Sequence, residues 1–284
     1  MLEEITQQSA SMHLEELLRI GDLFRSRGWP IEDEEASAFP SLFTRFCQMC
    51  DRLTPEQRDL MIEMTSDYQW LRRVDEEHRF FQAWKLMAAA LTSDVTSIVV
   101  IPLNFWDQGN SAFAMYYLAK GLSASLRGLA GNRPITFSSG AGVRKPNAIT
   151  VAVDDYVGSG TTAKDALQRL KKKNPTLVAM QVVTIAAQEA AINVLSSLGV
   201  PVFTDVRLRR GISDSSRLSV VKALKIMDSI ESMLHIEAEF RRGYEQTEGI
   251  VSLQRTPNNT FPVYWTNRKV GKIPWNPPFY RNTE

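Results

Sequence analysis

The chain of 284 residues carries 33 Lys and Arg against 32 Asp and Glu, which gives a formal net charge of +1. This balance argues against nucleic-acid binding driven by overall charge, although a local basic patch is compatible with it. No apolar run approaches membrane-spanning length, and the acidic start is unlike a signal peptide, so we expect a cytoplasmic protein with no membrane partner. The length suits one elaborated domain or two small ones.

The first third of the sequence has the pattern of helices. Residues 13–27 place leucines and a phenylalanine on one face, and residues 77–91 have a similar apolar face. Residues 54–57, Thr-Pro-Glu-Gln, form the cap, first-turn proline and returning glutamine of a helix start. We therefore expect residues 1–95 to form an N-terminal helical region.

The two cysteines, Cys47 and Cys50, lie in a Cys-x-x-Cys sequence without a second ligand pair for zinc. They follow helical spacing together with Phe43 and Phe46, which predicts buried structural thiols on a helix. The three histidines are scattered singly and form neither a triad nor a metal cluster.

From residue 97 the pattern alternates between strands and helices. Strands are expected at 98–101, 135–137, 149–153, 177–185 and 200–206, and helices at 111–126, from 163 onward, and at 189–198. This alternation is typical of an α/β fold with a mostly parallel sheet flanked by helices. We assign residues 96–230 to this core.

The most informative stretch runs from residue 149 to 163. A short β-branched strand leads to Asp154 and Asp155, then to a loop of Gly, Ser and Thr, then to a helix. Ligands of open α/β sheets bind at the carboxyl ends of the strands, and loop amides at a helix start suit a phosphate. Paired carboxylates suit ribose hydroxyls or a hydrated Mg2+ ion. The stretch therefore predicts a site for a phosphorylated ribose.

This loop has two other possible interpretations. A Walker A loop needs Gly-Lys-Ser/Thr after its spacer, and a dinucleotide fingerprint needs G-x-G-x-x-G; the sequence has neither. The plain alternative is a glycine-rich turn that caps a helix, with both carboxylates solvated. The succession of strand, acidic pair, loop and helix favours the sugar-phosphate site.

At residues 151–162 the chain resembles the type I phosphoribosyltransferases, whose signature is an apolar strand, two acidic residues and a small Thr/Ser/Gly loop. The resemblance implies that Asp154 and Asp155 hold the ribose hydroxyls of phosphoribosyl pyrophosphate and its Mg2+ ion. It also implies that the loop holds the 5-phosphate, through Val157, Gly158, Ser159, Gly160, Thr161 and Thr162. The sequence departs from the family at Gly158, where a threonine is common.

Two further loops have counterparts in that family. Residues 103–111 correspond to the loop with which the family binds pyrophosphate. Here Gly109, Asn110 and Ser111 offer amides at a helix start, although the loop contains neither Lys nor Arg. Packing by its aromatic residues explains this loop equally well. Residues 138–146 correspond to the mobile catalytic loop of the family, where Arg144 or Lys145 would neutralise the leaving group. A solvated hairpin tip is the alternative there.

The C-terminal segment, residues 231–284, is rich in proline and aromatic residues. Its Thr-Pro-Asn-Asn-Thr-Phe-Pro string at residues 256–262, with a tryptophan soon after, resembles the C-terminal extension of a phosphoribosyltransferase-like family from bacterial conflict and antiphage loci, some of them retron-linked. By analogy with the base-selecting hood of phosphoribosyltransferases, Asn258, Asn259 and Thr260 are expected to contact a base edge.

Three functions are compatible with these features. The first is an enzyme that binds Mg-phosphoribosyl pyrophosphate or a nucleotide and makes or breaks an N-glycosidic bond, as a bacterial antiphage effector. The second is a non-catalytic nucleotide sensor that signals to a partner. The third is a subunit that docks nucleic acid or protein through its tail, using Tyr264, Trp265, Arg268, Lys269, Trp275 and Arg281. Homo-oligomer formation stays open.

Overall fold

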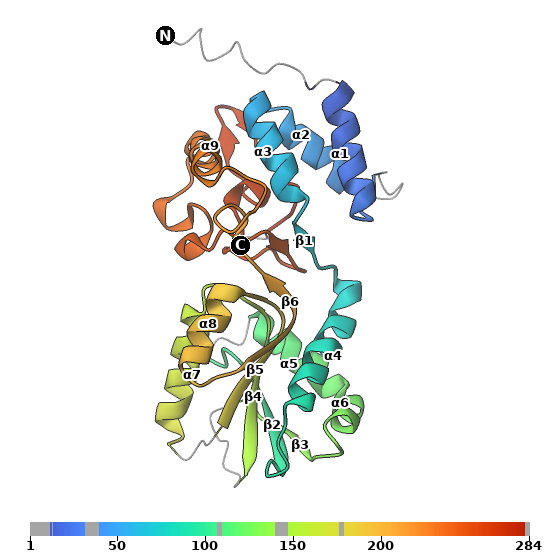
Figure 1. The fold of residues 1–284 in the computed structure, drawn as a ribbon, viewed down its shortest axis with the longest axis vertical. Coiled ribbons are helices and arrows are strands. Elements are labelled where there is room, and N and C mark those ends of the chain that lie inside the picture. Colours follow the sequence, from blue (N-terminus) through green and yellow to red (C-terminus); the bar gives the residue numbers. More distant parts are fainter. Residues whose placement is uncertain are drawn as a thin grey trace. The chain divides into compact units, whose positions relative to one another are not determined.

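The computed structural model describes residues 12, 14–31, 40–106, 110–139, 147–175 and 179–281, and the chain divides into two compact units (Figure 1). The sheet unit comprises Leu71–Arg209. The helical unit joins Met1–Trp70 to Arg210–Glu284. The junctions between the units therefore lie near residues 70 and 210, whereas the expected division into three parts placed them near 95 and 230.

The sheet unit is built on a five-stranded parallel sheet, which confirms the predicted fold class. The strand order is β3-β2-β4-β5-β6. The strands are β2 (Ser97–Pro102), β3 (Ile135–Phe137), β4 (Ala148–Val157), β5 (Ala179–Gln188) and β6 (Val202–Leu208). The middle of β4 is buried from Ile149 to Val153, as the β-branched run predicts for a strand covered on both faces.

Helices cover both faces of this sheet (Figure 1). They are α4 (Arg73–Ala89), α5 (Ser111–Gly121), α6 (Ser123–Leu129), α7 (Thr161–Lys173) and α8 (Glu189–Ser197). Helices α7 and α8 lie on one face and α4 with α6 on the other, where the Trp84 indole donates to the Leu126 carbonyl at 3.2 Å. The single helix expected at residues 111–126 is divided at Leu122, directly after Gly121, a residue of low helix propensity.

The helical unit contains four α-helices in its described residues, together with two pairs of short strands. These are α1 (Leu14–Ser26), α2 (Leu42–Cys50), α3 (Pro55–Thr65) and α9 (Val220–Met233), with β1 (Gln69–Trp70) paired to β7 (Val251–Ser252) and β8 (Lys269–Val270) paired to β9 (Ile273–Pro274). The predicted cap of α3 is present in full, because Thr54 and Gln57 each accept a backbone N–H of the other.

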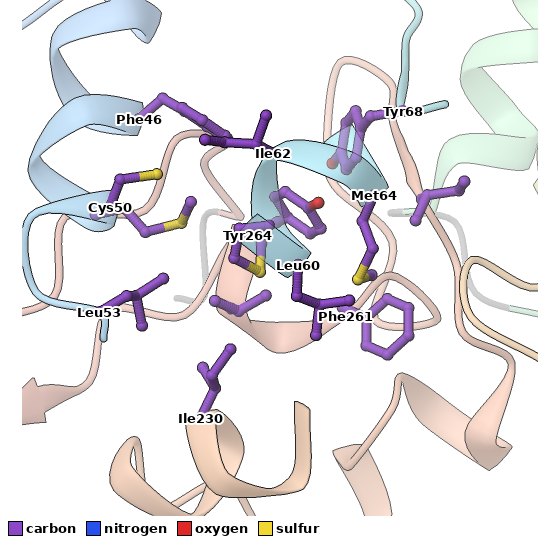
Figure 2. Packing of buried hydrophobic residues seen from close by; sticks show 14 of the residues in the cluster. Phe46, Cys50, Leu53, Leu60, Ile62, Met64, Tyr68, Ile230, Phe261 and Tyr264 are labelled. Carbon is purple, nitrogen blue, oxygen red and sulfur yellow. The ribbon is translucent and has the colours of Figure 1, made fainter. Parts of the chain in front are cut away.

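The core of the helical unit is shared between its N-terminal helices and the C-terminal segment (Figure 2). Tyr264 and Phe261 are fully buried among side chains of α2, α3 and α9. The Tyr264 hydroxyl lies 2.9 Å from the Thr65 hydroxyl, and the ring of Phe279 stacks on Tyr68 with centroids 4.4 Å apart. The proline-rich segment is thus a structural part of this unit, and its described residues form three short 3-10 turns at Ala238–Phe240, Tyr244–Gln246 and Pro262–Tyr264.

Cys47 and Cys50 lie on α2 as free thiols, as their spacing predicts. Burial raises the pKa of Cys47 to about 11, and burial raises the pKa of Cys50 as well. A thiol with a raised pKa is a poor nucleophile at neutral pH, which agrees with a packing role. Among the described residues, no helix combines the length and the apolar character needed to cross a membrane.

Candidate functional site

Asp154 and Asp155 lie inside strand β4, which continues to Val157 rather than ending at Val153 as expected. On one side β4 stays paired with β5, where Val157 lies opposite Ala187. On the other side β2 ends at Pro102, opposite Val153. The end of β4 that carries the two carboxylates therefore has a strand neighbour on the β5 side only, and residues from the loop after β2 reach it on the other.

The start of α5 occupies the position next to these carboxylates. Ser111, the first residue of α5, donates its hydroxyl to Asp154 Oδ1 at 2.9 Å, and the backbone N–H of Asp155 donates to the same oxygen at 2.9 Å. Asn110 caps the helix by accepting the Phe113 N–H at 3.3 Å, and its amide donates to the Asn104 carbonyl at 2.8 Å. These bonds confirm that the loop after β2 opens on the same sheet edge as the acidic pair.

The loop from Val157 to Thr162 makes a tight entry into α7. Gly160 adopts φ +86°, and a Cβ at this position would lie 3.2 Å from the Ala191 Cα. Both the backbone conformation and the close approach require glycine. The Ser159 hydroxyl accepts the Thr161 N–H at 3.3 Å, while the side chains of Thr161 and Thr162 are exposed at the N-terminus of the helix. The N-terminus of α7, with its first-turn amides and hydroxyls, is a type of position that suits an anion.

Burial and mutual repulsion raise the free energy of the charged acidic pair. Burial, followed by the negative charge of Asp155, raises the pKa of Asp154 well above its usual value, and hydrogen bonding from Ser111 opposes this rise. Burial also raises the pKa of Asp155. Two adjacent, half-buried carboxylates without a cation favour the protonated state, so a bound cation or a set of hydroxyl donors would relieve the repulsion.

Glu76 of α4 extends this negative region. Burial raises its pKa, the charge of Asp155 raises it further, and Arg73 has the opposite effect. One turn along the helix, Arg79 forms an ion pair of 2.8 Å with Asp205 of β6, which holds α4 against the sheet. Sequence reasoning missed Glu76, because no local pattern distinguishes it from the other acidic residues of the first turn.

The loop after β2 contains no Lys or Arg, and two cationic side chains of α7 pack against its Trp106 instead. The ring of Trp106 stacks on Phe105 at 3.7 Å, and the cationic groups of Arg169 and Lys173 lie 5.8 Å and 5.3 Å from its centroid. These two cations lie eight and twelve residues after Thr161, which is roughly 12 Å and 18 Å along the helix at 1.5 Å per residue. They contact Trp106 of the loop and lie well away from the N-terminal end of α7.

The remaining predicted residues fall into two groups. Gly109, Arg144 and Lys145 lie outside the described residues, and their roles stay predictions. Asn258, Asn259 and Thr260 belong to the helical unit. There Asn259 donates to the Tyr244 carbonyl at 3.3 Å, and the buried Thr260 hydroxyl donates to the Val251 carbonyl at 2.6 Å. These side chains therefore stabilise the C-terminal segment.

Comparisons with known proteins can be set beside this geometry. Orotate phosphoribosyltransferase from Aeropyrum pernix is 17% identical, with a TM-score of 0.29, over 46% of this chain and 72% of that one. The xanthine-guanine-hypoxanthine phosphoribosyltransferase of Helicobacter pylori is 12% identical, with a TM-score of 0.30, over 49% of this chain and 83% of that one. A hypothetical protein from Neisseria gonorrhoeae with bound ppGpp is 13% identical, with a TM-score of 0.30, over 57% and 97% of the two chains.

The sequence itself places the chain in a family. No curated protein matches it. The family model named PRTase-CE matches residues 78–281, from α4 through the C-terminal segment, which is well over half of the 284 residues. The chain therefore belongs to the PRTase-CE family, type I phosphoribosyltransferase-like proteins with a C-terminal extension.

Proposed function

We propose that the sheet unit binds a 5-phosphoribosyl group, as Mg-phosphoribosyl pyrophosphate or as a nucleotide, at the carboxyl end of β4. The observation that supports this most directly is the hydrogen bond from Ser111 to Asp154, next to the α7 entry at Gly160. It brings an acidic pair, a helix N-terminus and a second helix start to one edge of a parallel sheet. A sugar-phosphate ligand has matching parts, namely hydroxyls, a phosphate and a second anionic group.

Each part of the site has a proposed partner. Asp154 and Asp155 accept hydrogen bonds from ribose hydroxyls, and the residues from Val157 to Thr162 hold the 5-phosphate. The amides of Gly109, Asn110 and Ser111 face the pyrophosphate. Arg144 and Lys145 neutralise the leaving group, and Asn258, Asn259 and Thr260, the residues expected to form the hood, play no part in this proposal.

The residues present suit a magnesium ion that is held mostly by substrate and water oxygens. The acidic pair supplies hard oxygen donors whose repulsion a cation would relieve. Within the described ranges, no cluster of three or more His, Cys, Asp or Glu side chains is arranged to hold a metal by itself. The ion, when bound with substrate, supplies charge neutralisation for the pyrophosphate.

In the proposed reaction one bond to ribose C1 breaks and another forms. In transfer, a nitrogen nucleophile forms a bond to C1 while the bond from C1 to the pyrophosphate oxygen breaks. The electron pair of the broken bond leaves with pyrophosphate, and the proton of a neutral N–H nucleophile passes to water. In the degradative direction, water attacks C1 of a nucleotide, the N-glycosidic bond breaks, and the base leaves with that electron pair and takes up a proton. Both directions develop positive charge on the ribose ring, which the nearby carboxylates stabilise.

Calorimetry tests the binding site. Titration of the protein with Mg2+ and phosphoribosyl pyrophosphate should show saturable binding that the double variant Asp154→Asn, Asp155→Asn loses. Asp165→Asn is the matched control, because Asp165 is exposed on α7 and its replacement changes the charge of the same unit. Equal binding by the double variant and the control would refute the assignment of the site.

A non-catalytic sensor is the second candidate. It is favoured by the sequence of the loop after β2, which lacks the basic residue that phosphoribosyltransferases usually place there. Chromatography of phosphoribosyl pyrophosphate and a panel of nucleotides after incubation with the protein separates the two. Product formation that the double variant abolishes supports the enzyme, whereas binding without turnover supports the sensor.

The biological setting that we propose is bacterial antiphage defence, and it rests on the resemblance of the C-terminal segment to families from such loci. An enzyme at this site would deplete or modify nucleotides in an infected cell. Nucleotide pools measured by chromatography during phage challenge should fall in cells that express the wild-type chain. The pools should stay at control levels with the double variant, and equal pools in both strains would contradict a nucleotide-directed defence role.

A further inference from the structure

Several arginines of the helical unit are neutralised by a nearby carboxylate. Arg58 pairs with Glu16 at 2.6 Å, and Arg242 pairs with Asp228 at 2.6 Å. Arg45, Arg255 and Arg281 are among the arginines of this unit that form no ion pair within the described residues, and all three lie beside the same part of the C-terminal segment. A charged group that is partly withdrawn from water without a counterion carries a free-energy cost, and this applies to Arg45 and Arg281, which are both partly buried.

The three arginines are linked through the C-terminal segment. Arg45 of α2 lies 4.4 Å from the ring centroid of Tyr280 and donates to the Pro278 carbonyl at 2.8 Å. Arg281 donates to the Thr256 carbonyl at 2.8 Å, and the Thr256 hydroxyl donates to the Tyr280 carbonyl at 3.0 Å. Arg255 precedes Thr256 in the chain and is exposed.

Aromatic rings lie among these arginines. The guanidinium of Arg281 lies 5.4 Å from the ring centroid of Trp265, and Trp265 is held in place by its indole N–H, which donates to the Thr260 carbonyl at 2.7 Å. Tyr280 keeps 47% of its surface exposed although Arg45 packs against it. Guanidinium groups and aromatic rings therefore share one surface, here called the arginine surface: Arg45, Arg255, Trp265, Tyr280 and Arg281.

The charges of the arginine surface are not neutralised within the described residues. Burial and, to a smaller extent, the positive charge of Arg255 together lower the pKa of Arg281 to about 10. Burial also lowers the pKa of Arg45. Two like charges near each other, one of them half-buried, are stabilised when an anion binds between them.

Three of the six tail residues expected to dock a partner are buried or form an ion pair within the helical unit. Tyr264 and Trp275 are buried in the core, at 0% and 1% exposure, and Arg268 forms an ion pair with Glu237. Of that set, Trp265 and Arg281 lie on the arginine surface. The surface therefore joins a residue of α2 to the C-terminal segment, which the sequence alone did not indicate.

We propose that the arginine surface binds single-stranded nucleic acid, separately from the sugar-phosphate site of the sheet unit. Its guanidinium groups contact successive phosphates, and the exposed ring of Tyr280 stacks on a base. Phosphates match the charge of the three arginines. The aromatic ring beside them favours a polynucleotide over an acidic peptide, since a peptide carboxylate offers no base to stack.

Fluorescence anisotropy with labelled 20-nucleotide oligo-dT and oligo-U, over a range of NaCl concentrations, tests the proposal. Binding should weaken with salt. Arg255→Glu should weaken it about tenfold and should lower the slope of log affinity against log salt by roughly 0.7 for each phosphate that the variant no longer neutralises. Lys225→Glu is the matched control, because Lys225 is an exposed cation on α9 of the same unit, and it should bind like the wild type.

A second variant tests the stacking contribution. Tyr280→Leu should weaken binding while it leaves the salt slope unchanged, because the ring is removed and the charges remain. Within the described residues Arg255 makes no hydrogen bond or ion pair that its replacement would break, so the thermal midpoint of Arg255→Glu should match that of Lys225→Glu. Three outcomes would overturn the proposal: no salt-dependent binding by the wild type, equal affinity of Arg255→Glu and Lys225→Glu, or Arg255-dependent binding of poly-glutamate in place of both oligonucleotides.

Discussion

The Ser111 hydroxyl donates a 2.9 Å hydrogen bond to Asp154 Oδ1, and this contact joins the first residue of α5 to the end of β4. It connects two residues that lie 43 positions apart in the sequence. The bond also determines which oxygen of Asp154 is already occupied by protein donors, since the Asp155 N–H shares Oδ1. The charge of the acidic pair is therefore oriented before any ligand binds.

Removal of this hydrogen bond should weaken ligand binding. Ser111→Ala should raise the Kd for Mg-phosphoribosyl pyrophosphate about fivefold, equivalent to about 1 kcal/mol, because an unheld Asp154 must be ordered on binding. Ser111→Thr keeps the hydroxyl and should restore the affinity. Ser125→Ala on α6 is the control, and calorimetry that finds the same Kd for both alanine variants would show that Ser111 has no positioning role.

The acidic pair should lower the stability of the ligand-free protein. Asp154→Asn keeps the shape and the acceptor oxygen but removes one of two neighbouring charges, so the thermal midpoint at pH 7.5 should rise, with a gain of about 1 kcal/mol in unfolding free energy. The same variant should lose ligand binding. Thermal denaturation of Asp154→Asn against Asp165→Asn measures the difference, and a lower midpoint for Asp154→Asn would contradict the repulsion.

The entry of α7 should tolerate no Cβ at Gly160. Gly160→Ala combines a positive φ with a 3.2 Å approach to the Ala191 Cα, so it should destabilise the protein by roughly 2–3 kcal/mol. Gly199→Ala is the control, because Gly199 has φ +73° and nothing within 4 Å of its added Cβ, so only backbone strain of about 1 kcal/mol applies. Urea denaturation should show a larger loss of stability for Gly160→Ala, and equal losses would mean that the close approach relaxes without cost.

The stability of the helical unit should depend on pH through the titration of Glu231. Burial raises the pKa of this fully buried carboxylate on α9 from 4.5 to about 7, although the Arg242 N–H, which it accepts at 2.8 Å, opposes the rise. A raised pKa means that the folded state holds its proton while the unfolded state has already lost it. The contribution of Glu231 is therefore fully present below about pH 4.5, falls as the pH rises, and is lost above about pH 7.

Urea denaturation at several pH values checks this direction. Relative to Glu231→Gln, the wild type should lose stability between pH 5 and pH 7, by at most about 1.4 kcal/mol per pH unit, and the difference should be constant above pH 7.5. Glu239→Gln, an exposed site in the same unit, should show no such trend. A wild type whose stability relative to Glu231→Gln rises over this range would contradict the burial of a protonated carboxyl group.

Local sequence patterns were sufficient for the strands and helices of the sheet unit and for the position of the acidic pair. The β-branched run before Asp154 predicts a buried strand, and the Gly and Thr residues after it predict a tight helix entry, because these preferences act over a few residues. The ends of the elements were less predictable. Strand β4 continues to Val157 because β5 pairs with it there, and that pairing is a long-range interaction.

The arrangement of the parts depended on the tertiary structure. Helix α4 has the composition of the helices before it, yet it belongs to the sheet unit, where Arg79 pairs with Asp205. The sequence did not indicate the hydrogen bonds of Asn259 and Thr260, which hold the C-terminal segment to its own unit, and the expected contact of these residues with a base stays a prediction. A side chain's type says what it can bond to, but not which of several partners the fold will place within reach.

The sequence by itself predicted a phosphorylated-ribose site at residues 154–162 and determined the strand, carboxylates, glycine loop and helix start on which that prediction rests, because these features are contiguous and their chemistry is local. Only the tertiary structure showed that Ser111 orients Asp154, that Glu76 adds negative charge beside the pair, and that Arg45 joins Arg255 and Arg281 on one surface. These relationships join residues far apart in the chain. They arise from packing of whole elements, which a local pattern does not encode.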